Sequence, residues 1–196
     1  MAVVYRIARD GAGTMGWERY LNFRCTGCGN CCKGTYLTVT DADVRRILER
    51  TKRPLDDFLQ FWPIEDVDMS QRSPWAIKMS NRRKLMTVKW MRGQCSFLDK
   101  NDRCTIYTHR PMVCRSHPFE VSLTDGGGIE RMAMSRVVEC LHEWDGNITR
   151  RDLGLLERAS ARENDAYHAR VGAWNRERSR TRRTRPEFLR YLGLAD

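Results

Sequence analysis

The chain has 196 residues, of which 41% are hydrophobic and 31% are charged, a composition typical of a folded globular protein. No stretch approaches the roughly 18 uncharged apolar residues of a membrane-spanning helix, and the first residues lack the apolar core of a signal peptide. We therefore expect a cytoplasmic protein with no membrane contact, which argues against a secreted, disulfide-rich class.

The formal net charge of +10 is concentrated toward the end of the sequence. Between Asn147 and Asp196, twelve arginines stand against seven acidic residues, and six of those arginines lie between Arg176 and Arg185. Such a run is a candidate for weak contact with RNA or an acidic protein, although a solvated helix end would look the same. No zinc-finger, helix-turn-helix or RRM signature accompanies it, so sequence-specific nucleic-acid binding is not expected.

The first third of the sequence predicts two helices, and the whole chain divides into three expected segments. Thr40 is a good helix N-cap, because acidic residues and an apolar stripe at helical spacing follow it. Pro54 suits the first turn of a second helix that continues to Trp62 and ends at Pro63, which predicts a helical hairpin. The expected segments are a flexible N-terminal arm (1–16), a cysteine-cluster metal-binding domain (17–146) and a basic helical C-terminal extension (147–196).

The remaining elements complete the expected fold. Extended runs are predicted at Trp75–Met79, Lys84–Met91 and Phe119–Leu123, and the last of these leads through a glycine-rich turn into Ile129–Ser135 as a hairpin. From Thr149 to about Arg178 the apolar spacing is helical, and residues 186–192 predict a last turn or two. The expected class is α+β, with a small antiparallel sheet and helices organised around a cysteine-bound metal site, plus a basic C-terminal helical tail.

The cysteines carry the strongest functional signal. Four of the eight fall within eight residues, at Cys25, Cys28, Cys31 and Cys32. Because thiols stay reduced in the cytoplasm, metal ligation or redox chemistry is more plausible than disulfide bonding. A two-residue spacing lets a tight loop wrap one ion or cluster, and Gly27, Gly29 and Gly34 allow backbone amides to approach sulfur.

The other four cysteines are Cys95, Cys104, Cys114 and Cys140. Cys95 and Cys104 flank a turn-rich stretch, which predicts a hairpin that presents two thiols. Pro111 can begin a helical turn that carries Cys114. Cys140 is a further candidate ligand, although a buried cysteine can also serve as a small apolar residue. We expect a cysteine-rich N-terminal loop to close against a small sheet that bears Cys95, Cys104 and Cys114.

Several neighbours of Cys114 are weaker candidates. Arg110 and Arg115 could offset the charge of thiolates, bind an anionic substrate or form ordinary salt bridges. His117 is either a ligand or hydrogen-bond donor near the site or a common loop histidine, and Tyr107 is interpreted as a wall of the site. No residue stands out as a catalytic acid or base, so the sequence leaves enzymatic activity open.

The order of these residues resembles the YkgJ-type cysteine-cluster family, a CxxCxxCC domain described as zinc- or iron-chelating. The resemblance extends roughly from Phe23 to Cys140 and implies metal chelation. The cysteine motif is also similar to that of flagellin lysine methylases, which are associated with an iron-sulfur centre, and this similarity favours iron-sulfur. The residues that carry the resemblance are the quartet Cys25, Cys28, Cys31 and Cys32, followed by Cys95, Cys104, Tyr107, Arg110-Pro111, Cys114-Arg115 and Pro118-Phe119.

The choice of metal follows from ligand number. Adjacent Cys31 and Cys32 cannot easily join one zinc tetrahedron, and eight sulfurs exceed what one zinc needs. Two sites, or one site with spare redox thiols, would use the surplus. We therefore expect an iron-sulfur cluster of the 4Fe-4S type. Zinc is the alternative, and redox thiols without metal are the third possibility. In any metal-bound case the metal would link distant thiolates and stabilise the fold.

Three functions are compatible with this reading. The first is an iron-sulfur protein that transfers electrons to a protein partner or supports a modification reaction. The second is a zinc-stabilised interaction module without catalysis. The third, suggested only by the flagellin-methylase similarity, is a protein methyltransferase-like enzyme, against which stands the lack of a glycine-rich loop after a strand to hold S-adenosylmethionine.

Overall fold

A computed structural model describes residues 16–33, 36–67, 69–135, 138–177 and 183–195. The arm expected over residues 1–16 therefore lies almost wholly outside the described residues. The α-helices are α1 (Asp41–Thr51), α2 (Leu55–Phe58), α3 (Met112–Ser116), α4 (Arg150–Arg176) and α5 (Arg185–Tyr191). The strands are β1 (Arg24–Cys25), β2 (Leu59–Pro63), β3 (Ile77–Lys78), β4 (Arg83–Val88), β5 (Trp90–Met91), β6 (Gln94–Cys95), β7 (Phe119–Leu123), β8 (Ile129–Met134) and β9 (His142–Glu143).

Helix α1 begins where its capping signal predicts. The Oγ1 of Thr40 accepts a hydrogen bond from the backbone N–H of Asp43 at 3.1 Å, and the Asp43 carboxylate accepts one from the Thr40 N–H at 3.1 Å. This capping box satisfies two donors that the first turn would otherwise leave unpaired. The same Asp43 carboxylate accepts the backbone N–H of Met112 at 2.9 Å, so the cap of α1 also fixes the start of α3.

The predicted second helix is wrong beyond its first turn. Helix α2 ends at Phe58, and the next five residues form strand β2, which pairs antiparallel with β4 from Leu59↔Val88 to Pro63↔Lys84. Continuous pairing with β4 outweighs the helical spacing of the apolar residues. Strand formation depends on cross-strand partners, which the local sequence does not reveal. Pro63 is tolerated since β2 is an edge strand of the β2-β4-β3 sheet. The expected helical hairpin is therefore replaced by a helix and a strand.

The α+β class is confirmed, with the strands distributed over several small antiparallel sheets. The hairpin predicted after Phe119 is formed by β7 and β8, and its turn is closed by hydrogen bonds between Thr124 and Gly128. Two-stranded ribbons join β5 to β6 and β1 to β9. The β1-β9 ribbon matters most for the site, because it connects the beginning of the cysteine-rich segment to its end.

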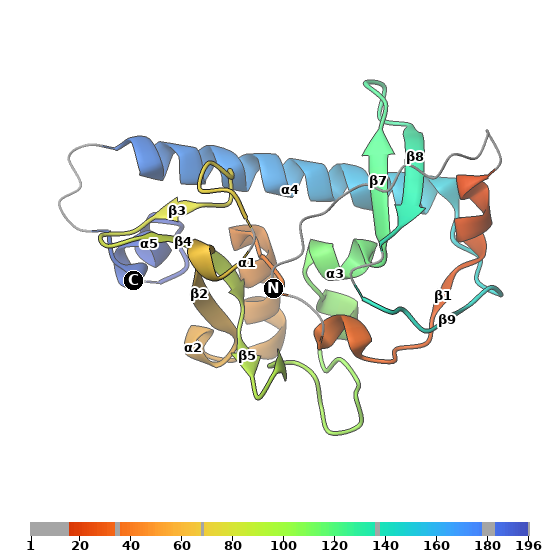
Figure 1. Cartoon of the computed structure of the whole chain (residues 1–196), viewed down its shortest axis with the longest axis horizontal. Helices are drawn as coiled ribbons and strands as arrows, with labels where there is room; N and C mark the ends of the chain where they lie inside the picture. Colours follow the sequence, from red (N-terminus) through yellow and green to blue (C-terminus); the bar gives the residue numbers. More distant parts are fainter. Residues whose placement is uncertain (1–15, 34–35, 68, 136–137, 178–182, 196) are drawn as a thin grey trace.

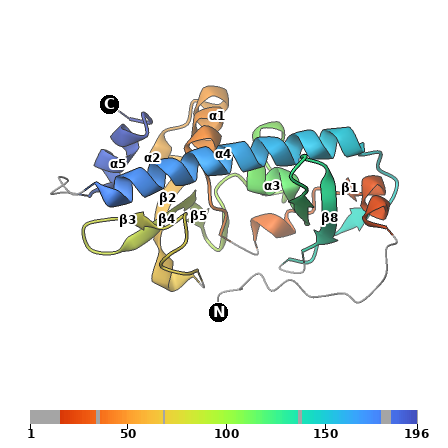
Figure 2. The ribbon, with the colours of Figure 1, turned by 90° about the horizontal axis from the view of Figure 1, so that it is seen from above.

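Helix α4 runs along most of the long axis of the molecule (Figure 1). Viewed from above, α4 passes over α1 and α3, while β8 lies beside its first half (Figure 2). Its residues Tyr167, Val171 and Trp174 are almost fully buried in the main core, which also contains Val44 and Ile47 of α1. Near its start, Leu153 joins a second apolar cluster with residues of β8 and of the 3₁₀ helix Trp17–Asn22.

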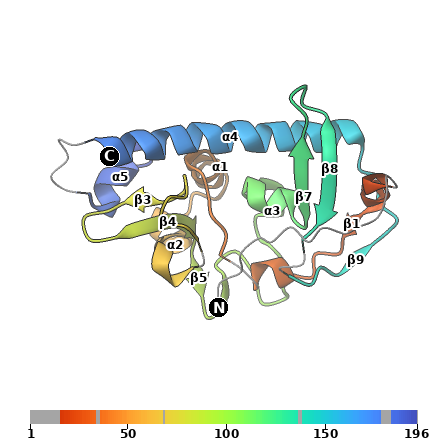
Figure 3. The same ribbon diagram turned by 45° about the horizontal axis from the view of Figure 1, so that its top comes forward.

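The C-terminal elements also pack on the main core. Thr184 is the N-cap of α5, and its Oγ1 accepts a hydrogen bond from the backbone N–H of Glu187. The helix buries Phe188 against Trp174, with ring centroids 5.0 Å apart. Figure 3 shows α5 below the end of α4, beside the β3-β4 strands. The domain boundary expected after residue 146 stays a prediction. In the described part of the chain, no helix combines the length and apolar character needed to cross a membrane.

Candidate metal centre

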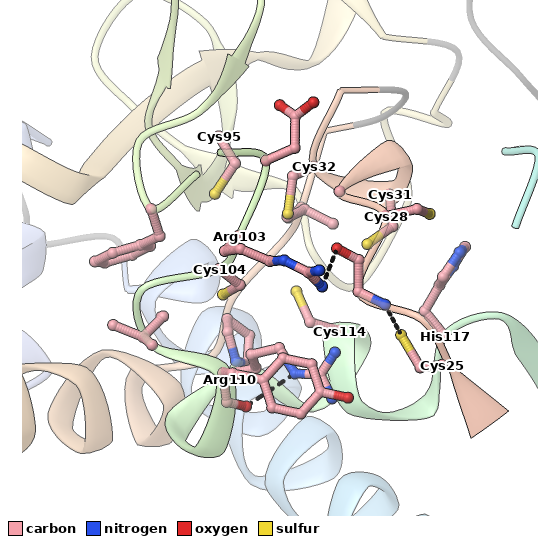
Figure 4. A pocket seen from close by; sticks show the side chains of 18 of the residues that line it. Cys25, Cys28, Cys31, Cys32, Cys95, Arg103, Cys104, Arg110, Cys114 and His117 are labelled. Atoms are coloured by element: carbon pink, nitrogen blue, oxygen red, sulfur yellow. Dashed lines mark hydrogen bonds between the residues drawn. The ribbon is translucent and has the colours of Figure 1, made fainter. Parts of the chain in front are cut away.

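One cavity of about 320 Å³ brings all eight cysteines together. Its other walls include the apolar side chains of Leu37, Val88, Phe97 and Ile106. A water molecule occupies roughly 30 Å³ of bulk liquid, so the space is far larger than one water or one metal ion. Figure 4 shows thiols that reach toward this space from several elements.

The N-terminal cysteines lie on a strand and a tight loop. Cys25 ends β1, and the backbone N–H of Gly27 donates a hydrogen bond to the Cys25 Sγ at 3.4 Å. Cys31 and Cys32 lie in the 3₁₀ turn Asn30–Cys32, which Gly29 precedes with a φ of 76°. The expected approach of backbone amides to sulfur is thus present at Gly27, while Gly34 lies outside the described residues.

Substitution of Gly29 should disturb this loop. A Cβ at Gly29 would lie 2.7 Å from the carbonyl oxygen of Asp102, in the hairpin that carries Cys104. Gly93 provides a matched control, because its φ of 81° is equally left-handed and nothing lies within 4 Å of its Cβ position. At either position, an alanine should lower the free energy of unfolding by about 1–2 kcal/mol, because an L-residue is strained in the left-handed backbone conformation.

We therefore expect Gly29→Ala to lower the melting temperature and metal retention more than Gly93→Ala does. Only the first substitution combines strained backbone with a clash against the opposing hairpin. Thermal unfolding and metal content of the two purified variants provide the measurement. Equal effects would show that the close approach of the loop and the hairpin is unimportant.

The second set of cysteines comes from a hairpin and a helix. Cys95 ends β6, and the turn that follows is closed by hydrogen bonds between Asp99 and Arg103, which places Cys104 opposite Leu98. The predicted hairpin with two thiols is therefore present. Cys114 belongs to α3, whose N-cap is Pro111, so the helical turn predicted after Pro111 is confirmed. The expectation that Cys114 lies on the small sheet is wrong. A proline preceding a helical turn explains this placement, as its fixed φ suits a helix start.

Three contacts hold the cysteine loop against the rest of the cavity wall. The Oγ1 of Thr26 donates to the carbonyl of Leu141 at 2.7 Å, and Asn30 donates to the carbonyl of Glu139 at 3.1 Å. From the other side, Arg103 donates to the carbonyl of Thr26 at 2.9 Å. Sequence reasoning missed Arg103, and its position immediately before Cys104 is the signal that could have indicated it.

Burial and neighbouring thiols disfavour deprotonation of several cysteines. Burial, with lesser contributions from Cys32 and other thiols, raises the pKa of Cys114 well above its usual range. A hydrogen bond from Cys31 lowers the pKa of Cys32, but contact with Cys95 and burial outweigh it and raise the value to about 12. Burial raises the pKa of Cys140 to about 11. Because a redox thiol reacts as its thiolate, these shifts disfavour Cys32, Cys114 and Cys140 as metal-free redox thiols.

The weaker candidates separate into wall residues and structural residues. The Arg110 guanidinium lies 3.9 Å from the centroid of the Tyr107 ring, and both side chains line the cavity. The positive charge of Arg110 opposes the burial-driven rise in the pKa of Cys104. His117 also lines the cavity, and its Nε2 is shielded from solvent without a hydrogen-bond partner among the described residues. Arg115 instead donates to backbone carbonyls of the preceding turn.

The thiols surround the cavity without converging on one point. Among the residues with described positions, no group of three or more His, Cys, Asp and Glu side chains is arranged to hold a single metal ion. A single tetrahedral zinc would therefore require several thiols to move inward. A cofactor with several metal atoms and sulfides fits a wide, thiol-lined space better, since its outer metal atoms reach toward the walls.

Metal binding should be strongly pH-dependent. The ligand form of cysteine is the thiolate, so each thiol that binds metal releases its proton. Since the pKa values of Cys32, Cys104 and Cys140 are raised, these protons are bound at neutral pH and metal must displace them. We expect apparent affinity to increase with pH between 6 and 9, by more than tenfold per pH unit where two or more protons are released.

Competition titrations with a chromophoric chelator across that pH range provide the measurement, and proton release can be followed with a pH indicator. In the metal-free protein, the free energy of unfolding should instead decrease as pH rises. A thiol whose pKa is raised by folding contributes stability that is fully present below its unfolded-state pKa. This contribution is lost as pH rises from that value through the raised pKa of the folded state. Affinity that does not change with pH would contradict ligation by these thiols.

An α+β chain whose eight thiols line one cavity falls in the class of cysteine-cluster, metal-chelating proteins. The chain belongs to the CxxCxxCC family, described as "Putative zinc- or iron-chelating domain", which it matches over residues 24–140. The YkgJ-type resemblance is thereby confirmed. An uncharacterized protein of Methanocaldococcus jannaschii is 32% identical over 114 residues, which are 56% of this chain and 53% of that protein. The match thus spans about half of that relative, and no solved structure matches the chain.

Proposed function

We propose that this chain is an iron-sulfur protein whose cysteine-lined cavity binds a 4Fe-4S cluster for electron transfer to a protein partner or for support of a modification reaction. The observation that carries the proposal is the enclosure of one cavity of about 320 Å³ by all eight thiols. When bound, such a cluster supplies reversible one-electron chemistry. The family description names both zinc and iron, so the choice of iron is our own proposal.

The protein's own residues suit this role. Leu37, Val88 and Phe97 form an apolar wall that limits water, and the charge of Arg110 offsets part of the negative charge of thiolates. The Gly27 N–H donates to the Cys25 sulfur, and hydrogen bonds to cluster sulfurs are one of the means by which proteins set a reduction potential. Tyr107 is 46% exposed at the cavity wall, so a partner could approach this side.

The test is the colour and composition of protein purified without oxygen. We expect a brown protein with broad visible absorbance from sulfur-to-iron charge transfer, and iron and sulfide in stoichiometric amounts. Cys28→Ser should weaken the absorbance. Leu155→Ser, a change at an exposed position of α4 outside the cavity, should leave it unchanged.

Zinc is the second candidate, and one observation favours it. Cys32 and Cys95 are buried within the main apolar core, where a structural metal would stabilise packing without any chemistry of its own. Zinc is d¹⁰ and colourless. A colourless protein with stoichiometric zinc and no iron or sulfide, even after anaerobic reconstitution, would overturn the iron-sulfur proposal in favour of a zinc-stabilised interaction module.

A further inference from the structure

The eight thiols of the cavity differ in how they relate to the apolar core. Cys32 and Cys95 are members of the main core, with exposed fractions of 7% and 4%. Cys104 and Cys114 are partly buried and pack against the same core, as does Cys31. The remaining three are outside it, namely Cys25, Cys28 and Cys140. The cavity therefore has a side that belongs to the core and a side that does not.

The side outside the core is built on the β1-β9 ribbon. Cys25 pairs with His142 across this ribbon, and Cys140 lies two residues before His142. The Thr26 and Asn30 side chains donate to carbonyls at Leu141 and Glu139, immediately beside Cys140. The loop from Cys25 to Cys31 is thus held directly against the segment that carries Cys140.

The side within the core is built on other elements. Cys95 and Cys104 flank the hairpin turn, Cys114 lies on α3, and Cys32 is the last residue of its 3₁₀ turn. The Cys32 thiol contacts that of Cys95. Figure 4 shows Cys95 and Cys104 on one side of the cavity, Cys25, Cys28 and Cys31 on the other, and Cys32 and Cys114 between them.

Cys31 lies at the junction between the two sides. It packs against the main core, yet it belongs to the turn that Asn30 begins, and the Asn30 side chain donates to the carbonyl of Glu139, next to Cys140.

We propose that the cavity contains two neighbouring four-thiolate sites, an inner site of Cys32, Cys95, Cys104 and Cys114 and an outer site of Cys25, Cys28, Cys31 and Cys140. Four thiolates are what either one zinc ion or one 4Fe-4S cluster takes. Consecutive residues cannot easily serve one tetrahedron, so the division of Cys31 and Cys32 between sites removes that difficulty. This inference rests on the proposed function only in that the cavity binds metal.

Thiol protection and metal content test the division whichever metal is bound. In the loaded wild-type protein all eight thiols should resist alkylation by iodoacetamide, with positions mapped by mass spectrometry. Cys25→Ser should lose half of the metal while the protein stays folded. Its outer thiols Cys28, Cys31 and Cys140 should then be alkylated, and the four inner thiols should remain protected.

The neighbouring pair Cys31→Ser and Cys32→Ser provides a matched comparison of the two sites. Cys31→Ser should expose the outer thiols and Cys32→Ser the inner ones, with about half of the metal retained in each folded variant. If Cys32→Ser fails to fold because its thiol belongs to the core, Cys25→Ser and the wild-type metal count decide the question. Loss of all metal from a folded Cys25→Ser protein would overturn the division, as would a loaded wild-type protein with four reactive thiols.

The outcomes separate this inference from the proposed function. Two zinc ions per chain, with all eight thiols protected, would support two sites and overturn the iron-sulfur proposal. One cluster per chain, with four thiols open to alkylation, would support the iron-sulfur proposal and overturn the two-site inference. Two clusters per chain would support both.

Discussion

Removal of residues 147–196 is expected to abolish the cooperative thermal transition of this protein and its retention of metal. The deleted segment includes Tyr167, Val171, Trp174 and Phe188, each at most 1% exposed within the core that also contains Cys32. Loss of a single buried Phe or Trp side chain typically costs about 3–5 kcal/mol, whereas whole domains are stable by about 5–15 kcal/mol. The combined loss exceeds that stability. Circular dichroism melting and metal analysis of the truncated chain provide the measurement.

A point variant makes the same test without deleting chain. Trp174 is fully buried, and its indole N–H donates to the carbonyl of Lys78 at 2.9 Å, so Trp174→Ala should cost about 3–5 kcal/mol. Leu155→Ala, at a 50% exposed position of the same helix, should cost far less. A truncated protein that keeps a sharp transition and its metal would instead support the boundary expected after residue 146.

Several helices and strands could be predicted from local signals in the sequence. Thr40 is the predicted N-cap of α1, the glycine-rich turn joins β7 to β8, and the apolar spacing after Thr149 corresponds to α4. In each case the deciding interactions lie within a few residues along the chain. Such elements can be predicted from one sequence because their energetics are largely local.

Elements that depend on distant partners could not be predicted. The five residues of β2 have helical apolar spacing, and only their pairing with β4 makes them a strand. The β1-β9 ribbon pairs residues from opposite ends of the cysteine-rich segment, and nothing near Arg24 indicates Glu143 as its partner. Strand formation of this kind is decided by tertiary context rather than by local propensity.

At the candidate site, too, contacts between distant residues could not be predicted. All eight cysteines could be named as candidate ligands from the sequence, because residue type and spacing are visible there, and all eight line the cavity. Their grouping could not be predicted, since the nearness of Cys140 to Cys25 depends on the β1-β9 ribbon and that of Cys32 to Cys95 on core packing. Arg103, which reaches across to the cysteine loop, was missed because its partner is a backbone carbonyl, and carbonyls are indistinguishable in a sequence.

Exhaustive removal of metal under reducing, oxygen-free conditions is expected to lower the melting temperature by about 10 °C. A ligand that binds only the folded state at 1,000 times its Kd stabilises it by about 4 kcal/mol, and in a chain of this size each kcal/mol corresponds to about 2–4 °C. Differential scanning calorimetry of loaded and stripped protein provides the measurement. Restoration of the transition by added metal is the control for irreversible damage, and an unchanged melting temperature would show that the metal does not stabilise the fold.

The loss of stability should also be localised. The strands β1 and β9 contain two residues each and lie outside the main core, so the loop from Cys25 to Cys31 depends on the thiolate ligands more than α1 or α4 does. Amide hydrogen exchange of stripped protein should therefore rise most in residues 24–32 and 138–143 and least around Val44 and Val171, which are buried by apolar packing alone. An equal increase in amide exchange along the whole chain would mean that the metal stabilises the whole fold and not chiefly the cysteine loop.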